Sequence, residues 1–178
     1  LYTWGRNYKS AIDPKNTSDS YVTGVPVDIT KNNSMLNGAV RINSDAIGHT
    51  GSVLRSDGQI VSWGYNGYGS AGNGTTSDRI TTTQADLNGK KALYAKQGWH
   101  NAVAITTDGL VMMWGYAGYG TTGLGNSTTN KKPTVVADYS KHNYEQAIET
   151  MSADSIEMQA DDSDDTSLKK VSVNLVMK

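Results

Sequence analysis

Residues 63–74 read WGYNGYGSAGNG, and residues 114–125 read WGYAGYGTTGLG. The two stretches lie 51 residues apart, and the same offset links an Asp-Gly pair at 57–58 to an Asp-Gly pair at 108–109. Several landmarks that share one offset indicate an internal structural repeat, because chance similarity would not keep them in phase.

Further landmarks extend the repeat toward the start of the chain. His49 and His100 are related by the same offset. Residues 1–7 read LYTWGRN, which places a third Trp-Gly pair 59 residues before Trp63. The extra length predicts a loop insertion between residues 9 and 22, where Asp, Asn, Ser, Thr and Pro cluster.

Each unit predicts a β-hairpin followed by a glycine-rich loop. In the second unit, residues 52–55 and 59–63 are β-favouring runs on either side of the Asp-Gly pair, and residues 103–105 and 110–114 repeat this in the third. Asp-Gly between two such runs is a strong hairpin signal, because glycine tolerates the positive φ of the turn. Both faces of these runs are apolar, which predicts small sheets covered on each side by a neighbouring sheet.

The pattern Trp-Gly-x-Asn-x-x-Gly-x-x-Gly-x-Gly after an Asp-Gly hairpin resembles the repeat of the regulator of chromosome condensation family. Residues 63–74 match this pattern in full, whereas the third unit has Ala117 where the family favours Asn. The first copy keeps Asn7 but has Ser10 at the next glycine position. The resemblance covers roughly residues 1–140 and is specific for fold rather than for function.

The resemblance implies a seven-bladed β-propeller with about 50 residues in each blade. This chain holds two complete copies of the repeat and two partial ones, and a propeller needs at least about four blades to close. The expected fold is therefore all-β: a partial propeller of antiparallel blades that this chain alone does not close. Further polypeptide, further copies of the chain or other protein partners would complete it.

The repeat phase predicts four segments along the chain. We expect a partial first blade with a loop insertion at residues 1–47, one blade at 48–97, a second at 98–147 and a degenerate terminal hairpin at 148–178. The following residues are assigned to the packing and turns of the repeat: Trp4, Gly5, His49, Asp57, Gly58, Trp63, Gly64, Asn66, Gly69, Gly72, Gly74, His100, Asp108, Gly109, Trp114, Gly115, Gly120, Gly123 and Gly125.

Composition argues against several classes of function. The 178 residues carry a formal net charge of −1, and their Lys and Arg residues are scattered, so we expect no nucleic-acid partner. The chain lacks an apolar run of about 18 residues, which argues against membrane insertion. It contains no cysteine, so thiolate nucleophiles and cysteine metal sites are excluded. Its first residue is Leu1, which suggests a processed product or a piece of a longer chain.

Aromatic residues are the main candidates for a binding surface. Tyr65, Tyr68, Tyr116 and Tyr119 belong to the glycine-rich loops, and loop tyrosines are common in binding sites. Trp99 falls outside the repeat series and is the tryptophan most expected to be exposed.

The three tryptophans of the repeat series allow two interpretations. Trp4, Trp63 and Trp114 could form a stacking platform for sugars or bases. Their identical place in the repeat favours packing between blades instead.

Candidates for metal binding and catalysis are weak. A run of Asp161, Asp162, Asp164 and Asp165 offers oxygen ligands for calcium, but its spacing does not match the calcium loop, and a solvated turn is the favoured interpretation. The three histidines, of which His142 lies outside the repeat, favour structural roles. We therefore predict no metal site, no cofactor and no catalytic residue.

Three functions remain as hypotheses. The favoured one is a non-catalytic binding or structural module of an extracellular or virion surface assembly, such as a tail, fibre or decoration component. Its polar loops at residues 13–24, 73–84 and 126–134 would face outward, and a cell-surface glycan is one conceivable partner. The second is guanine nucleotide exchange or another regulatory protein–protein interaction in the cytoplasm or nucleus. The third, polysaccharide cleavage by paired carboxylates, has only Asp57 and Asp108 in its favour, and both occupy turns.

Overall fold

The computed structural model describes residues 1–31, 33–44 and 48–141. Residues 1–141 form one compact unit. His142, the expected terminal hairpin at 148–178 and the acidic run at 161–165 lie outside the described residues.

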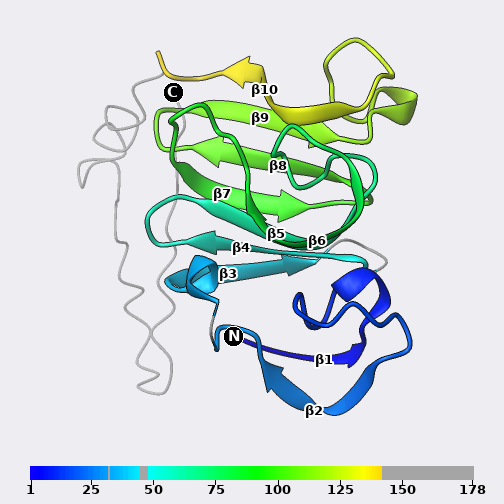
Figure 1. The fold of residues 1–178 in the computed structure, drawn as a ribbon. Coiled ribbons are helices and arrows are strands. Elements are labelled where there is room, and N and C mark those ends of the chain that lie inside the picture. Colours follow the sequence, from blue (N-terminus) through cyan, green and yellow to red (C-terminus); the bar gives the residue numbers. More distant parts are fainter. Residues whose placement is uncertain (32, 45–47, 142–178) are drawn as a thin grey trace, which may run out of the picture. The chain divides into compact units, whose positions relative to one another are not determined.

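Three antiparallel sheets make up the unit (Figure 1). The first sheet pairs two strands, β1 (Tyr2–Arg6) and β2 (Val22–Asp28). The second has four strands in chain order, β3 (Ala39–Ser44), β4 (Thr50–Arg55), β5 (Ile60–Asn66) and β6 (Ser77–Gln84). The third also has four, β7 (Ala92–Gln97), β8 (Asn101–Thr106), β9 (Leu110–Gly115) and β10 (Asn130–Asp138).

The prediction of an all-β partial propeller is confirmed. The described helices are three single 3₁₀ turns, η1 (Tyr8–Ser10), η2 (Ser34–Leu36) and η3 (Gly118–Gly120). None of the helices in the described ranges is long and apolar enough to cross a membrane. The strands of both four-stranded sheets follow chain order, so each sheet is a simple meander, as a propeller blade requires.

The sheets are offset by one strand from the expected segments. β3 pairs with β4, and β7 pairs with β8, so the two four-stranded sheets span residues 39–84 and 92–138. The expected divisions after residues 47 and 97 fall inside these sheets and need this correction. The expected boundaries were placed just before His49 and His100. β3 and β7 come before these histidines in the chain, but they hydrogen-bond to β4 and β8, which come after them, so each sheet begins one strand earlier than expected.

All three expected polar loops overlap strands, since β2 already begins at Val22, within residues 13–24. β6 occupies most of residues 73–84, and β10 begins within residues 126–134. Both are outermost strands of their sheets, and their residues are exposed or only partly buried. Such strands can be rich in polar β-branched threonine, which suits a half-exposed pleated surface.

The apolar core lies between neighbouring sheets. One cluster joins Ile29 of the first repeat to Val53 and Val61 of the second sheet. Another joins Leu54 and Leu87 to residues of β7, β8 and β9 in the third sheet. No sheet forms a core alone, so each depends on its neighbour for burial.

A tryptophan of each four-stranded sheet closes the contact with the preceding repeat. Trp63 and Trp114 are both 1% exposed. The indole N–H of Trp63 donates to the carbonyl of Ala11 at 2.8 Å, and that of Trp114 donates to the carbonyl of Ser70 at 2.7 Å. Ala11 and Ser70 occupy equivalent places in their loops, so the same inter-repeat contact forms twice.

Trp4 has the same position in the repeat and was predicted to pack in the same way, but it is 62% exposed. The first sheet consists of β1 and β2 only, and the described residues supply no sheet before it. Trp63 and Trp114 thus pack between described repeats, whereas the described residues do not test the expected packing role of Trp4.

The glycine after each buried tryptophan allows a close backbone approach. Gly64 and Gly115 have φ of +94° and +93°. A Cβ atom at either glycine would overlap the carbonyl oxygen of His49 or His100, respectively. These two carbonyls accept the N–H groups of Tyr65 and Tyr116, each at 2.8 Å. The tryptophan of each pair is thus required for packing against the preceding repeat. The glycine is required because the backbone hydrogen bond to the histidine carbonyl leaves no room for a side chain.

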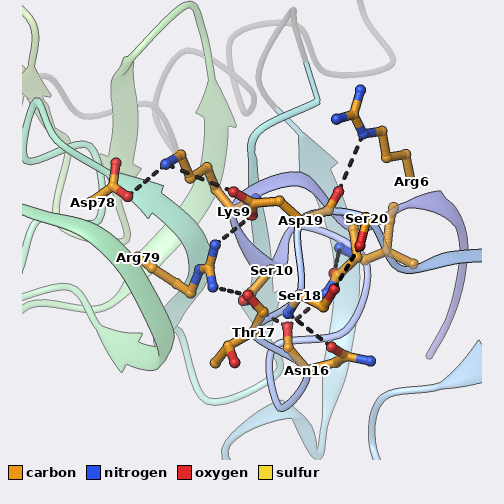
Figure 2. A network of polar contacts seen from close by, with 12 residues as sticks. Arg6, Lys9, Ser10, Asn16, Thr17, Ser18, Asp19, Ser20, Asp78 and Arg79 are labelled. Carbon is orange, nitrogen blue, oxygen red and sulfur yellow. Dashed lines mark hydrogen bonds and ion pairs between the residues drawn. The ribbon is translucent and has the colours of Figure 1, made fainter.

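Ion pairs attach the insertion loop of the first repeat to the second sheet. The Lys9 ammonium lies 2.6 Å from a carboxylate oxygen of Asp78 in β6 and 4.0 Å from one of Asp19. The Arg79 guanidinium donates to the Asp19 carboxylate and to the carbonyl of Thr17 (Figure 2). This network gives the loop a fixed place beside β6.

A further ion pair joins the linker after the second sheet to the third sheet. The Lys90 ammonium lies 2.6 Å from a carboxylate oxygen of Asp108, and the Thr106 hydroxyl donates to the same carboxylate at 2.5 Å. The bond from Lys90, followed by the bond from Thr106, lowers the pKa of Asp108 below its ordinary value. The carboxylate form is therefore favoured in the folded protein.

We predict that Trp114→Phe destabilises the protein by about 2–3 kcal/mol, because the carbonyl of Ser70 loses its buried donor and a cavity forms. Trp99→Phe serves as the control, since Trp99 is 51% exposed and its replacement should change stability by at most about 0.5 kcal/mol. Urea denaturation measures both free energies of unfolding. Equal effects of the two substitutions would contradict the inter-repeat role of Trp114.

Acid should remove the stabilisation that the ionised Asp108 provides. A group with a lowered pKa in the folded state stabilises fully above its unfolded pKa, about 4 for Asp, and loses that contribution as the pH falls through the folded value. Thermal midpoints measured on the acid side of pH 5 should fall less steeply for Asp108→Asn than for the wild type. Lys90→Met should give the same reduced dependence. An unchanged acid dependence in both variants would refute the assignment.

Candidate functional site

A row of aromatic rings runs across the corners of three successive repeats. We define the aromatic row as the residues whose rings contact one another in this chain: Tyr8, His49, Tyr65, Tyr68, His100, Tyr116 and Trp99.

The repeat itself brings these side chains together. Each histidine precedes the second strand of a sheet, and each tyrosine of the pair follows the Trp-Gly corner of the third strand. The hydrogen bonds from Tyr65 N–H to His49 and from Tyr116 N–H to His100 fix the two backbones side by side. Every complete repeat therefore presents one histidine and one tyrosine at the same corner.

The rings form a continuous chain of contacts at the centre of the row. The centroid of the His100 ring lies 5.2 Å from that of Tyr65, 4.8 Å from that of Tyr68 and 4.9 Å from that of Trp99. The Tyr116 ring meets those of Tyr68 and Trp99 edge-on, at 5.1 and 5.6 Å. Edge-on and tilted arrangements at these separations are the attractive ones for aromatic pairs.

The first-repeat end of the row carries positive charge. The Tyr8 ring lies 4.6 Å from the His49 ring, and the Arg6 guanidinium and the Lys9 ammonium lie 5.7 and 5.2 Å from the Tyr8 centroid. Both distances fit cation–π contacts. The row thus offers aromatic surface along its length and ends in the cation–π contacts of Arg6 and Lys9, of which Lys9 is also paired with Asp78.

Burial varies along the row. His100 is 6% exposed, whereas Trp99 is 51% exposed. Burial, followed by the proximity of Tyr68, raises the pKa of Tyr65 above its ordinary value, so its phenol stays neutral and can donate a hydrogen bond. The buried members hold the more exposed rings in place.

Four of the five predicted binding residues belong to the aromatic row: Tyr65, Tyr68, Tyr116 and Trp99. The fifth, Tyr119, is 97% exposed and makes no ring contact with the described residues. It lies inside η3 with φ of +60°, which directs the loop differently from its counterpart Tyr68.

Sequence reasoning missed Tyr8 and gave His49 and His100 only structural roles. Their backbone carbonyls do have such a role, yet their rings also belong to the row. The signal that could have found them is the shared repeat offset, which places a histidine beside each Trp-Gly-Tyr corner.

Metal ligands do not cluster in the described part of the chain. The described residues contain no group of three or more His, Asp, Glu or Cys side chains that could hold a metal ion. Asp57 and Asp108, the candidate paired carboxylates, occupy hairpin turns and form ion pairs with Arg55 and Lys90 at 2.7 and 2.6 Å. The calcium candidates Asp161, Asp162, Asp164 and Asp165 fall outside the described residues and remain a sequence prediction.

Comparison with known proteins finds relatives that carry the same repeat. The chain is 29% identical over 85 residues to the ultraviolet-B receptor UVR8 of Arabidopsis thaliana, covering 47% of this chain and 19% of the receptor. It is 34% identical over 80 residues to the mitochondrial RCC1 domain-containing protein RUG3 of the same plant, covering 44% of this chain and 18% of that protein. The chain thus matches less than a fifth of the length of either protein. No protein-family model matches it.

Solved structures give the same fold. Human WBSCR16 matches with a TM-score of 0.63 and 18% identity, covering 76% of this chain and 34% of that structure. Yeast RCC1 (Prp20), solved bound to Kap60, matches with a TM-score of 0.51 and 18% identity, covering 78% of this chain and 32% of its own. The stacked meander sheets, the Trp-Gly corners and these likenesses lead to one conclusion: the chain is built from β-propeller repeats of the regulator of chromosome condensation type.

Proposed function

We propose that the chain is a non-catalytic regulatory module that binds another protein through the aromatic row. The observation that carries this proposal is the continuity of the row across three repeats. Tyrosine and tryptophan are enriched where proteins bind one another, because they bury a large area with little loss of conformational entropy.

The rigidity of the row supports a binding role. The backbone hydrogen bonds between each histidine and the following corner tyrosine fix the rings before any partner arrives. A preformed surface loses less entropy on association, so more of the contact energy becomes affinity. Lys9 is already paired with Asp78, so Arg6 is the cation beside Tyr8 that adds a preference for acidic groups of a partner at that position.

The relatives favour a regulatory interaction over the surface-assembly hypothesis. One is a receptor, another has been solved bound to a protein partner, and a third is mitochondrial. These names support a setting inside the cell and give no support to a virion, an extracellular assembly or a glycan partner. Guanine nucleotide exchange remains a narrower version of the proposal, testable by release of labelled nucleotide from a purified small GTPase.

Site-specific crosslinking can identify the partner and map the contact in one experiment. A photoreactive phenylalanine analogue at Tyr116 should capture a protein from the native cell extract, whereas the same analogue at Tyr119 should not. The captured protein is then purified and titrated calorimetrically against the wild-type chain and its variants.

We predict that Trp99→Ala and Tyr68→Ala each weaken this binding at least about ten-fold, as for central interface aromatics. Tyr119→Ala is the matched control and should leave the affinity unchanged. Unchanged affinity in Trp99→Ala and Tyr68→Ala, or equal losses in all three variants, would contradict the proposal.

A further inference from the structure

The sequence contains four Asn-Gly pairs, at residues 37–38, 66–67, 73–74 and 88–89. In such a pair the asparagine side chain can react with the following backbone nitrogen, because glycine has no Cβ atom to keep that nitrogen away from the carboxamide carbon. The reaction also requires a backbone conformation that brings the two atoms together. The four pairs therefore differ according to the turn in which each lies.

Hydrogen bonds hold two of these pairs in place. The carboxamide oxygen of the buried Asn66 accepts the N–H of Ala71 at 2.9 Å. The backbone N–H of Gly74, whose nitrogen would have to attack the Asn73 side chain, donates to the carbonyl of Lys131 at 2.9 Å. Each reaction would first have to break such a hydrogen bond, so the fold protects both pairs.

The pair at residues 37–38 lies in a turn of unsuitable geometry. Asn37 has φ of −65° and ψ of 143°, and Gly38 has φ of +75°, which are the angles of a type II turn. Rotating the peptide group between them would give a type I turn, with ψ of about −30° at the asparagine. The five-membered ring that the reaction forms requires ψ of about −120°, as at the first central residue of a type II′ turn. Neither form of this turn provides that angle.

The pair at residues 88–89 occupies a turn that can reach the required angle. This turn joins β6 to β7, and the N–H of Lys90 donates to the carbonyl of Leu87 at 3.1 Å. Asn88 and Gly89 have φ of +53° and +76°, and positive φ at both central residues defines a type I′ turn. Rotating the peptide group between them gives a type II′ turn, which keeps φ positive at Asn88 and sets its ψ to about −120°. Glycine accepts either sign of φ, so Gly89 permits the rotation.

The reacting groups of this turn are not held by the rest of the described chain. Neither the carboxamide of Asn88 nor the N–H of Gly89 has a hydrogen-bond partner among the described residues. A Cβ atom built on Gly89 would meet no described atom within 4 Å. A cavity of about 330 Å³ borders Gly89 and Lys90, which gives the peptide group and water room to move. The turn thus combines a reachable ring geometry with space for the reaction.

We propose that Asn88 is a site of spontaneous deamidation, in which the backbone nitrogen of Gly89 attacks the carboxamide carbon, Cγ, of Asn88. A bond forms between this nitrogen and Cγ while the Cγ–Nδ2 bond breaks, and Nδ2 leaves as ammonia with the proton of the Gly89 nitrogen. Water then opens the succinimide ring at one of its two carbonyl carbons. Opening at Cγ gives aspartate, and opening at the backbone carbonyl gives isoaspartate, in which the chain continues through the side chain.

The modification changes charge and backbone length where two sheets are joined. The carboxylate of Asp86 accepts the N–H of Asn88 at 3.1 Å and forms an ion pair with Lys132 of β10 at 2.8 Å. A new negative charge at residue 88 repels Asp86, and isoaspartate adds one atom to the backbone of the turn. The modification therefore acts on the connection between the second and third sheets. It does not depend on the aromatic row or on a partner bound there.

Mass spectrometry of the full 178-residue chain, aged in mildly alkaline buffer and digested in acid, tests the proposal. Asn88 should deamidate at least about ten-fold faster than Asn37, Asn66 and Asn73, a difference of about 1.4 kcal/mol in activation free energy. Its peptide should give aspartyl and isoaspartyl products of equal mass, which chromatography separates. Equal rates at the four sites, or a faster rate at any of the other three, would overturn the proposal.

The same chain unfolded in guanidinium chloride separates the effect of the turn from that of the local sequence. All four asparagines precede glycine, so the unfolded chain should deamidate at similar rates at the four sites. The preference for Asn88 should appear only in the folded protein. An equally strong preference in the unfolded chain would show that the type I′ turn is not its cause and would overturn the proposal.

Two matched variants test the role of the glycine nitrogen. Gly89→Asn keeps a residue that tolerates positive φ, but its Cβ atom hinders the attack, so deamidation of Asn88 should slow by a similar factor. Gly38→Asn makes the same change at φ of +75° in the other exposed turn and should leave the rate at Asn88 unchanged. An undiminished rate in Gly89→Asn, or an equal loss in both variants, would overturn the proposal.

Discussion

The hydrogen bond from a buried indole to a loop carbonyl of the preceding repeat organises this molecule. This hydrogen bond determines the position of the loop, and the position of the loop determines which residue types its turns require. The carboxamide oxygen of Asn66 accepts the N–H of Ala71 at 2.9 Å, and that of Asn7 accepts the N–H of Ile12 at 2.9 Å. Each asparagine thus shapes the loop next to the carbonyl that receives the following tryptophan. Glycine then lets the neighbouring sheet approach closely.

This dependence explains why single sheets have no core of their own. Apolar residues such as Val61 and Met112 are buried only because another repeat lies against them. The stability of the unit therefore depends on the interfaces between neighbouring repeats, as in other repeat proteins. It also explains why Trp4, which has no described sheet before it, differs in burial from Trp63 and Trp114, since burial depends on the neighbour rather than on the strand itself.

The sequence predicted the hairpins and the Trp-Gly corners well, because these depend on local signals. Asp57-Gly58 and Asp108-Gly109 form the tight turns between β4 and β5 and between β8 and β9, as their flanking runs indicated. The outer strands β6 and β10 were missed because half-exposed strands with many polar residues, such as the threonines of β6 and Lys131 and Lys132 of β10, look like loops when only polarity is considered. The boundaries of the sheets were displaced by one strand, because hydrogen-bond pairing across a histidine corner leaves no mark in the repeat pattern. For the candidate site, the loop tyrosines were visible from their type and place, whereas the contribution of the histidine rings needed the spatial proximity of successive corners.

Hydrogen exchange of the four indole N–H groups, followed by nuclear magnetic resonance, tests most directly whether inter-repeat tryptophans hold the structure together. We predict strong protection at Trp63 and Trp114, lost only when the whole unit unfolds, and far faster exchange at Trp99. Rapid exchange at Trp63 and Trp114 under native conditions would contradict this prediction, since the two hydrogen bonds to the preceding loops would then not be persistent.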